Sequence, residues 1–208
     1  MGIFQDALSP FFEPDQFRRI QAVKIGIAGA GGIGSNCAMI LVRCGFGNFT
    51  IVDFDRVEPS NLNRQIYTPA HIGRMKVDCL KEVLLTVNAS VSTSAVCERV
   101  TRENADSVFD DCDVIIEAFD SASSKADLFS VFLHSGKLIV GVSGIGGIGN
   151  CTSISILKVA ENVYVVGDRE SEVNEKVRPY APRVMVASAM MADVVLGAVV
   201  SGDVRNKI

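Results

Sequence analysis

Glycines at the end of an apolar run are the first residues whose types and spacing suggest chemistry. Gly29, Gly31 and Gly34 follow the GxGxxG spacing directly after residues 23–28, a short β-branched run that predicts a strand. Apolar side chains recur at helical spacing over residues 36–44, so the loop should open a helix. The free N–H groups at the start of a helix attract anions, and this stretch therefore predicts a phosphate loop.

A carboxylate extends this prediction to a whole nucleotide. A second β-rich run, residues 49–52, ends at Asp53, which lies 19 residues after Gly34. Nucleotide-binding folds place an acid at about this distance, where it accepts hydrogen bonds from the ribose hydroxyls. We therefore expect Asp53 to bind the ribose, while Gly31, Gly32 and Gly34 let backbone amides approach the phosphates.

The residues after Asp53 decide between two kinds of nucleotide. The glycine spacing alone is typical of NAD-dependent oxidoreductases, whose sites need one acid on the ribose and a largely apolar nicotinamide pocket. Here Asp55, Asn61 and Arg64 lie within residues 53–65, and Lys76 begins a further helical pattern. A triphosphate needs several cationic donors to neutralise its charge during transfer, so Arg64 and Lys76 favour a nucleoside triphosphate.

Four motifs in this order resemble the ThiF/MoeB/HesA family, the bacterial relatives of ubiquitin-activating enzymes. They are GAGGIGSN (residues 29–36), DFDRVEPSNLNRQ (53–65), GRMK (73–76) and AFDS (118–121). The likeness spans about residues 19–201, and the short chain is most similar to the ThiF-type subgroup of sulfur carrier protein (ThiS) adenylyltransferases. The resemblance implies an enzyme that uses ATP to activate the C-terminal glycine of a small ubiquitin-like sulfur carrier ending in Gly-Gly. It further implies an acyl adenylate, release of pyrophosphate and a place in thiamine biosynthesis. The alternatives are an NAD-dependent oxidoreductase and a catalytically silent carrier-binding scaffold.

The resemblance also implies roles for single residues. Arg64, Lys76 and Asp120 match the family's catalytic residues, with Asp120 as the magnesium ligand and Asp55 assisting it. The implied ligands of ATP are Gly29, Gly31, Gly32, Gly34, Asp53, Asp55, Asn61, Arg64, Gln65, Lys76 and Val100. Longer relatives carry a zinc site of two CxxC pairs; this sequence has no CxxC pair, so no zinc is expected.

The elements that must position these residues alternate between strand and helix. We expect strands over residues 23–28, 49–52, 91–96, 113–118 and 137–142, and helices over 36–44, 77–87, 104–109 and 123–134. This order predicts an α/β, Rossmann-like fold with a mostly parallel twisted sheet flanked by helices. Ligands in such sheets bind at the carboxyl ends of the strands, where Gly29, Asp53, Val100 and Asp120 all fall.

Residues 143–202 predict extra strands and a final helix. Strands are expected over 151–157 and 162–166, with Cys151 as a packed residue. The glycine cluster at 144–149 fits either a place where another backbone approaches, such as a carrier's tail, or a flexible connection. Residues 168–176 are charged and without periodicity, which predicts a mobile segment, and the family resemblance implies that this segment is a crossover loop. The apolar stretch 182–200 predicts a buried or dimer-interface helix, and hence a homodimer.

Composition limits the remaining options. The 208 residues are 48% apolar, which suits a single domain over 1–208. Within it, the resemblance implies a nucleotide-binding core at about 23–142 and carrier-binding elements at about 143–202. A net charge of −4 gives no general attraction to nucleic acid or anionic membranes, so neither is an expected partner. The first residues lack a signal-peptide pattern, which favours the cytoplasm. Residues 1–10 predict a loose arm, followed by helical turns over 14–20 with Arg18 and Arg19 on the surface.

Overall fold

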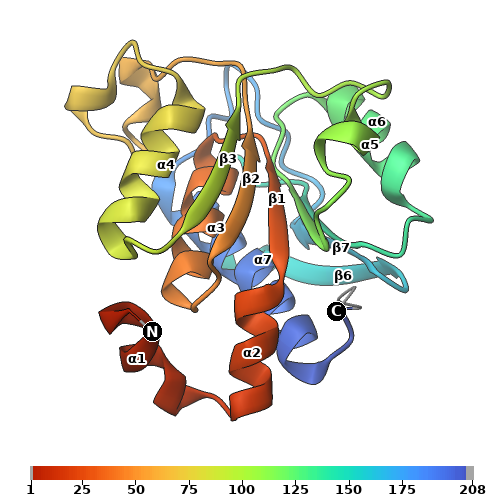
Figure 1. The fold of residues 1–208 in the computed structure, drawn as a ribbon. Coiled ribbons are helices and arrows are strands. Elements are labelled where there is room, and N and C mark those ends of the chain that lie inside the picture. Colours follow the sequence, from red (N-terminus) through yellow and green to blue (C-terminus); the bar gives the residue numbers. More distant parts are fainter. Residues whose placement is uncertain (1, 205–208) are drawn as a thin grey trace.

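A seven-stranded sheet runs through the middle of the molecule (Figure 1). The computed structural model describes residues 2–204 and places the strands in the order β3-β2-β1-β4-β5-β7-β6. All neighbours pair in parallel except β6 and β7, which are antiparallel. The strands are β1 (Lys24–Ala28), β2 (Asn48–Val52), β3 (Ser92–Val96), β4 (Val114–Glu117), β5 (Leu138–Val142), β6 (Ser155–Ala160) and β7 (Val163–Gly167). The predicted Rossmann-like, mostly parallel fold is confirmed, and β6 and β7 are its extra strands.

Helices cover both faces of this sheet (Figure 1). One core joins α3, α4 and α7 to a sheet face that includes Ile27 and Phe49, and a second core joins α5 and α6 to the opposite face through Val52 and Ile139. The helices are α1 (Ile3–Leu8), α2 (Pro14–Ala22), α3 (Gly32–Arg43), α4 (Lys76–Val87), α5 (Ala105–Val108), α6 (Ala122–Phe132) and α7 (Ala181–Ser201). Short 3-10 turns occupy Ser9–Phe11, Pro59–Asn61, Pro69–His71 and Cys151–Ser153.

Helix α3 begins at Gly32, four residues before the expected start. A Cβ on Gly34 would lie 1.8 Å from the Gly29 carbonyl oxygen, so only glycine lets the first turn of α3 lie directly on the end of β1. Glycine disfavours helix interiors, and for this reason the sequence pattern became helical only after the glycine run. The early start brings the first N–H groups of α3 to the carboxyl end of the sheet.

The N-terminal segment differs from the expected loose arm, because Ile3–Leu8 forms helix α1. Arg19 of α2 is also not an ordinary surface residue. Its guanidinium donates to the carbonyl oxygens of Val199 at 3.0 Å and Val200 at 2.6 Å, in the last turn of α7. Cations at a helix C-terminus satisfy carbonyls that have no partner within the helix. Arg19 therefore fastens α2 to α7.

The second glycine cluster receives this chain's own backbone. A Cβ on Gly146 would lie 2.8 Å from Val177 Cγ1 and 3.3 Å from the carbonyl oxygens of Ser171 and Glu172. The expected strand at 151–157 starts only at Ser155, because Cys151–Ser153 forms a 3-10 turn after Asn150, whose φ is +49°. The close approach predicted for this loop is therefore an internal contact with residues 171–177.

Residues 168–180, here called the strap, are fixed at their start rather than freely mobile. Asp168 forms a buried ion pair with Arg183 of α7, which also donates to the carbonyl oxygens of Gly149 at 3.0 Å and Asn150 at 2.8 Å. Burial raises the pKa of Asp168, but the N–H groups of Ser171 and Glu170, the Ser171 hydroxyl and Arg183 outweigh it and lower the pKa to about 2. The carboxylate thus stays charged and joins the strap to the glycine cluster and α7.

Helix α7 explains the apolar C-terminal stretch. With a mean hydropathy of 2.0 it is long and apolar enough to cross a membrane by length and composition alone. It packs instead against α3, α2, β5 and β7, with Val184, Met191, Val195 and Val199 buried. The expectation of a core-covering helix is met on this face, while Met185 and Gly197 on the other face remain exposed.

Candidate active site

Asp53 braces the glycine loop at the carboxyl end of the sheet. Its Oδ2 accepts the Ala30 N–H at 2.7 Å, and its Oδ1 accepts the Asp55 N–H at 2.8 Å. Burial raises the pKa of Asp53, while Lys76 and the two N–H groups oppose that rise. Each carboxylate oxygen has two lone pairs, so Asp53 can hold the loop and still accept a hydrogen bond from a ribose hydroxyl.

The glycine loop leaves space beside these groups. A Cβ on Gly31 would meet only Gln65 Nε2, at 4.0 Å, whereas a Cβ on Gly29 would lie 2.9 Å from the Ala118 carbonyl oxygen. Gln65 is buried, and within residues 2–204 its Oε1 has no hydrogen-bond partner. A buried, unpaired amide oxygen beside an open loop is the arrangement that a polar ligand would complete.

Lys76 begins α4 with its ammonium in the site. Its Nζ donates to Asp55 Oδ2 at 2.8 Å, and the Lys76 side chain is almost fully buried. This ion pair engages the carboxylate that we expected to assist magnesium, and that assistance stays a prediction. Among the residues described, Lys76 therefore has one counter-charge within ion-pair distance, and an approaching phosphate would add a second.

Tyr67 is a site residue that the sequence reasoning missed. Its hydroxyl donates to the Ala30 carbonyl oxygen at 2.7 Å and lies 3.3 Å from the Lys76 carbonyl oxygen. Burial, followed by the charge of Asp53, raises the pKa of Tyr67, so the hydroxyl stays protonated. Tyr67 links the glycine loop to the start of α4.

Arg64 lies against the start of α3. A Cβ on Gly32 would be 3.4 Å from Arg64 Cγ, and Asn36 Nδ2 donates to the carbonyl oxygens of Gly32 at 2.6 Å and Arg64 at 2.8 Å. The Arg64 guanidinium donates hydrogen bonds to two neutral acceptors, the Ser60 carbonyl oxygen at 2.9 Å and Asn63 Oδ1 at 2.7 Å. Partial burial lowers its pKa, and the charge of Asp120 opposes this, so Arg64 and Asp120 influence one another electrostatically.

Asn61 and Val100 occupy supporting positions. Asn61 is buried, and its Oδ1 accepts the Glu58 N–H at 3.1 Å, which stabilises the turn that carries Arg64. Val100 is buried after the end of β3, within the core that contains Ala28 and Val52. Both lie at the expected edge of the sheet, and their contact with a nucleotide stays a prediction.

Asp120 follows β4 and is exposed, but a buried side chain holds the loop that carries it. Glu117, at the end of β4, is fully buried; its Oε1 accepts the Phe119 N–H at 2.8 Å, and both its oxygens accept from Lys125 Nζ at 2.9 and 3.0 Å. Lys125 also donates to the Val142 carbonyl oxygen at 2.9 Å. The sequence reasoning missed this pair, which ties the Asp120 loop to α6 and β5.

Magnesium fits this donor set. Mg²⁺ is usually held by one or two protein carboxylates together with substrate phosphates, and it needs no all-protein cage. The exposed carboxylate of Asp120 can supply one such ligand. Within the part of the chain that the structure describes, no three His, Cys, Asp or Glu side chains gather as a metal cage.

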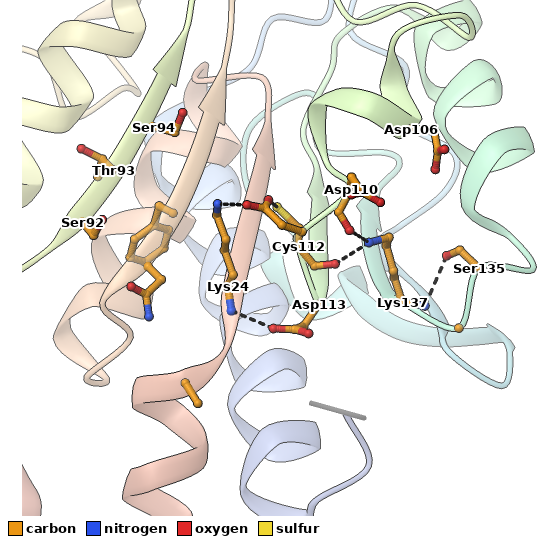
Figure 2. A pocket seen from close by; sticks show the side chains of 15 residues that line it. Lys24, Ser92, Thr93, Ser94, Asp106, Asp110, Cys112, Asp113, Ser135 and Lys137 are labelled. Atoms are coloured by element: carbon orange, nitrogen blue, oxygen red, sulfur yellow. Dashed lines mark hydrogen bonds and ion pairs between the residues drawn. The ribbon is translucent and has the colours of Figure 1, made fainter. Parts of the chain in front are cut away.

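A large cavity lies elsewhere, at the amino ends of the strands (Figure 2). Its volume is about 1290 Å³, but both lysines in its lining already interact with acceptors of the protein itself. Lys24 pairs with Asp111, and Lys137 Nζ donates to the carbonyl oxygens of Phe109, Asp110 and Cys112 at 3.1, 2.7 and 2.6 Å. This cavity therefore lacks the free cations that a triphosphate requires.

Comparison with known proteins finds relatives both by sequence and by fold. Over 138 residues the chain is 36% identical to the adenylyltransferase and sulfurtransferase UBA4 of Candida glabrata, and over 146 residues it is 30% identical to the adenylyltransferase and sulfurtransferase MOCS3 of Arabidopsis thaliana. These matches cover 66% and 70% of this chain, which spans about a third (32%) of the length of each relative. Among solved structures, E. coli tRNA N6-threonylcarbamoyladenosine dehydratase, TcdA, in complex with AMP superposes with a TM-score of 0.86 at 20% identity, covering 97% of this chain and 95% of that one. TcdA in complex with ATP gives a TM-score of 0.80 at 21% identity, over 95% and 92% of the two chains.

A protein-family model also matches the chain. Residues 5–206 match the ThiF family, nearly the whole chain and all four of the motifs identified in the sequence. The structure places three of those motifs, the glycine loop, the Arg64 turn and the Asp120 loop, at one edge of the sheet, with Lys76 of the fourth beside them. The chain therefore belongs to the ThiF family.

Proposed function

We propose that this chain is an ATP-dependent adenylyltransferase that activates the C-terminal glycine carboxylate of a small ubiquitin-like carrier protein. The observation that carries the proposal is the gathering of Arg64, Lys76 and Asp120 around a glycine loop that Asp53 braces. The names of UBA4 and MOCS3, both adenylyltransferases, and the ATP and AMP complexes of TcdA support a nucleotide at this edge. We assign nucleotide binding to residues 23–142 and carrier binding to residues 143–202.

The reaction that these residues suit is an in-line displacement. A carboxylate oxygen of the carrier attacks the α-phosphorus of ATP, the bond to the bridging oxygen breaks, and pyrophosphate leaves with that electron pair. Lys76 and Arg64 offset the charge that develops on the phosphate oxygens, and the N–H groups at the start of α3 hold them in place. Magnesium, when held by Asp120, would supply further charge neutralisation. Buried Asp53 holds the glycine loop in position and accepts a hydrogen bond from the ribose.

We further propose a ThiS-like sulfur carrier ending in Gly-Gly as the substrate, because the sequence motifs resemble those of the family that contains this subgroup. The names of UBA4 and MOCS3 mention neither ThiS nor thiamine, so the identity of the carrier and its pathway rests on the sequence resemblance. A catalytically silent scaffold is disfavoured, because such a protein would not need to keep Arg64, Lys76 and Asp120 together.

Pyrophosphate exchange tests the proposed reaction. We expect labelled pyrophosphate to enter ATP only when magnesium and a carrier ending in Gly-Gly are both present. The matched control is the same carrier without its last two glycines, which should not support exchange. Binding of NAD in preference to ATP, or ATP binding with no exchange for any carrier tested, would contradict the adenylyltransferase proposal.

We also propose that two chains form a symmetric homodimer. The exposed face of α7 carries Met185, Ala189 and Gly197, with a single charge at Asp193, and such a face can pack against its own copy. Static light scattering should give about twice the mass of one chain at micromolar concentration. A monomeric mass under those conditions would rule out this interface.

A further inference from the structure

A second, smaller cavity lies beside Arg64. Its volume is about 360 Å³, at the lower end of the range of roughly 300–1,000 Å³ that small-molecule sites occupy. One wall is the turn that carries Arg64, and the other wall is the strap. The lining residues are Ser60, Asn63, Arg64, Asn174, Glu175, Arg178 and Pro179.

The charges around this cavity suit an anion. Arg64 and Arg178 supply two guanidinium groups, and neither forms an ion pair with a carboxylate in the part of the chain that the structure describes. Glu175 is the one acid in the lining, and the remaining polar groups are neutral amides and a hydroxyl. Arginine pairs well with phosphate because its planar fork donates two parallel hydrogen bonds.

The backbone that carries Arg178 is held in place. The Gly147 N–H donates to the Arg178 carbonyl oxygen at 2.9 Å, and Pro179 forms a bridge with Gly146. Across the cavity, Asn63 Nδ2 lies 3.5 Å from the Pro179 carbonyl oxygen. The buried Asp168–Arg183 pair fixes the other end of the strap. Arg178 therefore starts from a positioned backbone, which reduces the entropy lost when its side chain meets a ligand.

We propose that Arg178 is a second cationic ligand, with Arg64, for the β- and γ-phosphates of the nucleotide and for the pyrophosphate that leaves. This inference rests on the proposed adenylyl transfer, because it places the leaving group in that cavity. When the bond between the α-phosphorus and its bridging oxygen breaks, the negative charge gathers on pyrophosphate, between the two guanidinium groups. The strap thus supplies one of the two cations that meet the leaving group.

Nucleotide binding to single variants tests this assignment without any need for turnover. We expect Arg178→Ala to weaken binding of ATP and of pyrophosphate, measured by calorimetry with magnesium present, by about 10- to 100-fold, as for the loss of a hydrogen bond to a charged group. AMP lacks the two outer phosphates, so its affinity should stay within about twofold. Glu175→Gln removes the one acid of the cavity and should strengthen ATP binding.

Lys176→Ala is the matched control, because Lys176 lies on the same strap but outside the cavity lining. It removes one positive charge and should leave ATP and AMP affinity unchanged. Arg178→Lys keeps the charge and loses the planar fork, so it should fall between the wild-type chain and Arg178→Ala. Equal weakening of ATP and AMP by Arg178→Ala, or equal effects of Arg178→Ala and Lys176→Ala, would overturn the assignment. A failed exchange assay with this ATP–AMP pattern intact would instead count against the proposed carrier reaction.

Discussion

Asp120→Asn is expected to lower the rate of adenylate formation by about 10²- to 10³-fold, with the fold unchanged. The substitution keeps the size of the side chain and removes the charge that we assign to magnesium, and the loss of one preplaced electrostatic partner in a transition state has effects of this order. Asp120 is exposed after β4, so the fold does not depend on its charge. Single-turnover adenylation at increasing magnesium concentration is the measurement.

Asp106→Asn provides the control, because Asp106 is an exposed carboxylate at the opposite end of the sheet. It should leave adenylation unchanged. Asp120→Asn should also reach half of its own maximal rate only at a higher magnesium concentration than the wild-type chain needs. Wild-type activity of Asp120→Asn at ordinary magnesium concentration would show that Asp120 has no role in the reaction.

The largest loss of stability is expected from Lys125→Met, at about 3 kcal/mol of the free energy of unfolding. The substitution leaves the buried Glu117 carboxylate without its partner, and breaking one side of a buried pair typically costs about 3–5 kcal/mol. We choose the lower end of this range because the Lys125 side chain is 23% exposed. Urea unfolding at pH 7 measures the difference.

The pH dependence of this loss has a definite sign. Burial already raises the pKa of Glu117 in the folded chain, with Lys125 and the Phe119 N–H opposing it, and removal of Lys125 raises it further. Between the unfolded value, about 4.3, and the raised folded value, the folded state binds more protons, so stability falls as pH rises. Lys125→Met should therefore be least harmful near pH 4 and most harmful at neutral pH.

Two further variants separate charge from packing. The double variant Glu117→Gln with Lys125→Met carries no charge at either of these two positions. It should therefore recover part of the stability lost at pH 7, and the pH dependence caused by Glu117 should disappear. Lys24→Met removes a lysine whose partner Asp111 is largely exposed, and such surface pairs contribute at most about 1 kcal/mol. Equal destabilisation by Lys24→Met and Lys125→Met would mean that the Lys125–Glu117 pair contributes no more to stability than the more exposed Lys24–Asp111 pair.

Local sequence pattern was enough to predict the central sheet. The strands at residues 49–52 and 137–142 match β2 and β5 to within one residue, because buried parallel strands are continuous apolar runs. The pattern failed where a tertiary contact decides the conformation. Helix α1 exposes Ile3 almost completely, so its sequence has no periodic apolar face to reveal it. The turn at Cys151–Ser153 depends on the left-handed Asn150, which alternating side chains cannot show.

The sequence motifs predicted candidate ligands at this site, but they did not reveal the residues that hold those candidates in place. The motifs located Asp53, Arg64, Lys76 and Asp120, since these residues lie in short, ordered segments. Tyr67 acts through one hydroxyl on a backbone carbonyl, and nothing in its neighbours marks it as a link. Glu117 at the end of β4 pairs with Lys125 of α6, and Asp168 of the strap pairs with Arg183 of α7, 15 residues further along the chain. Sequence spacing alone does not predict such meetings.

The position of α7 has a consequence for how the protein is made. On the ribosome, all seven strands and α3 are synthesised before α7, yet α7 packs against α3 and its last turn receives Arg19 of α2. Until α7 emerges, the nascent chain can pair its strands but leaves an apolar face of α3 in water, the kind of surface that makes partly folded chains aggregate. Arg19 and α7 thus join two segments that lie 180 residues apart in the sequence. The core between α3 and α7 cannot close until α7 has emerged, and a ribosome stall before residue 181 would hold α3 in that exposed state.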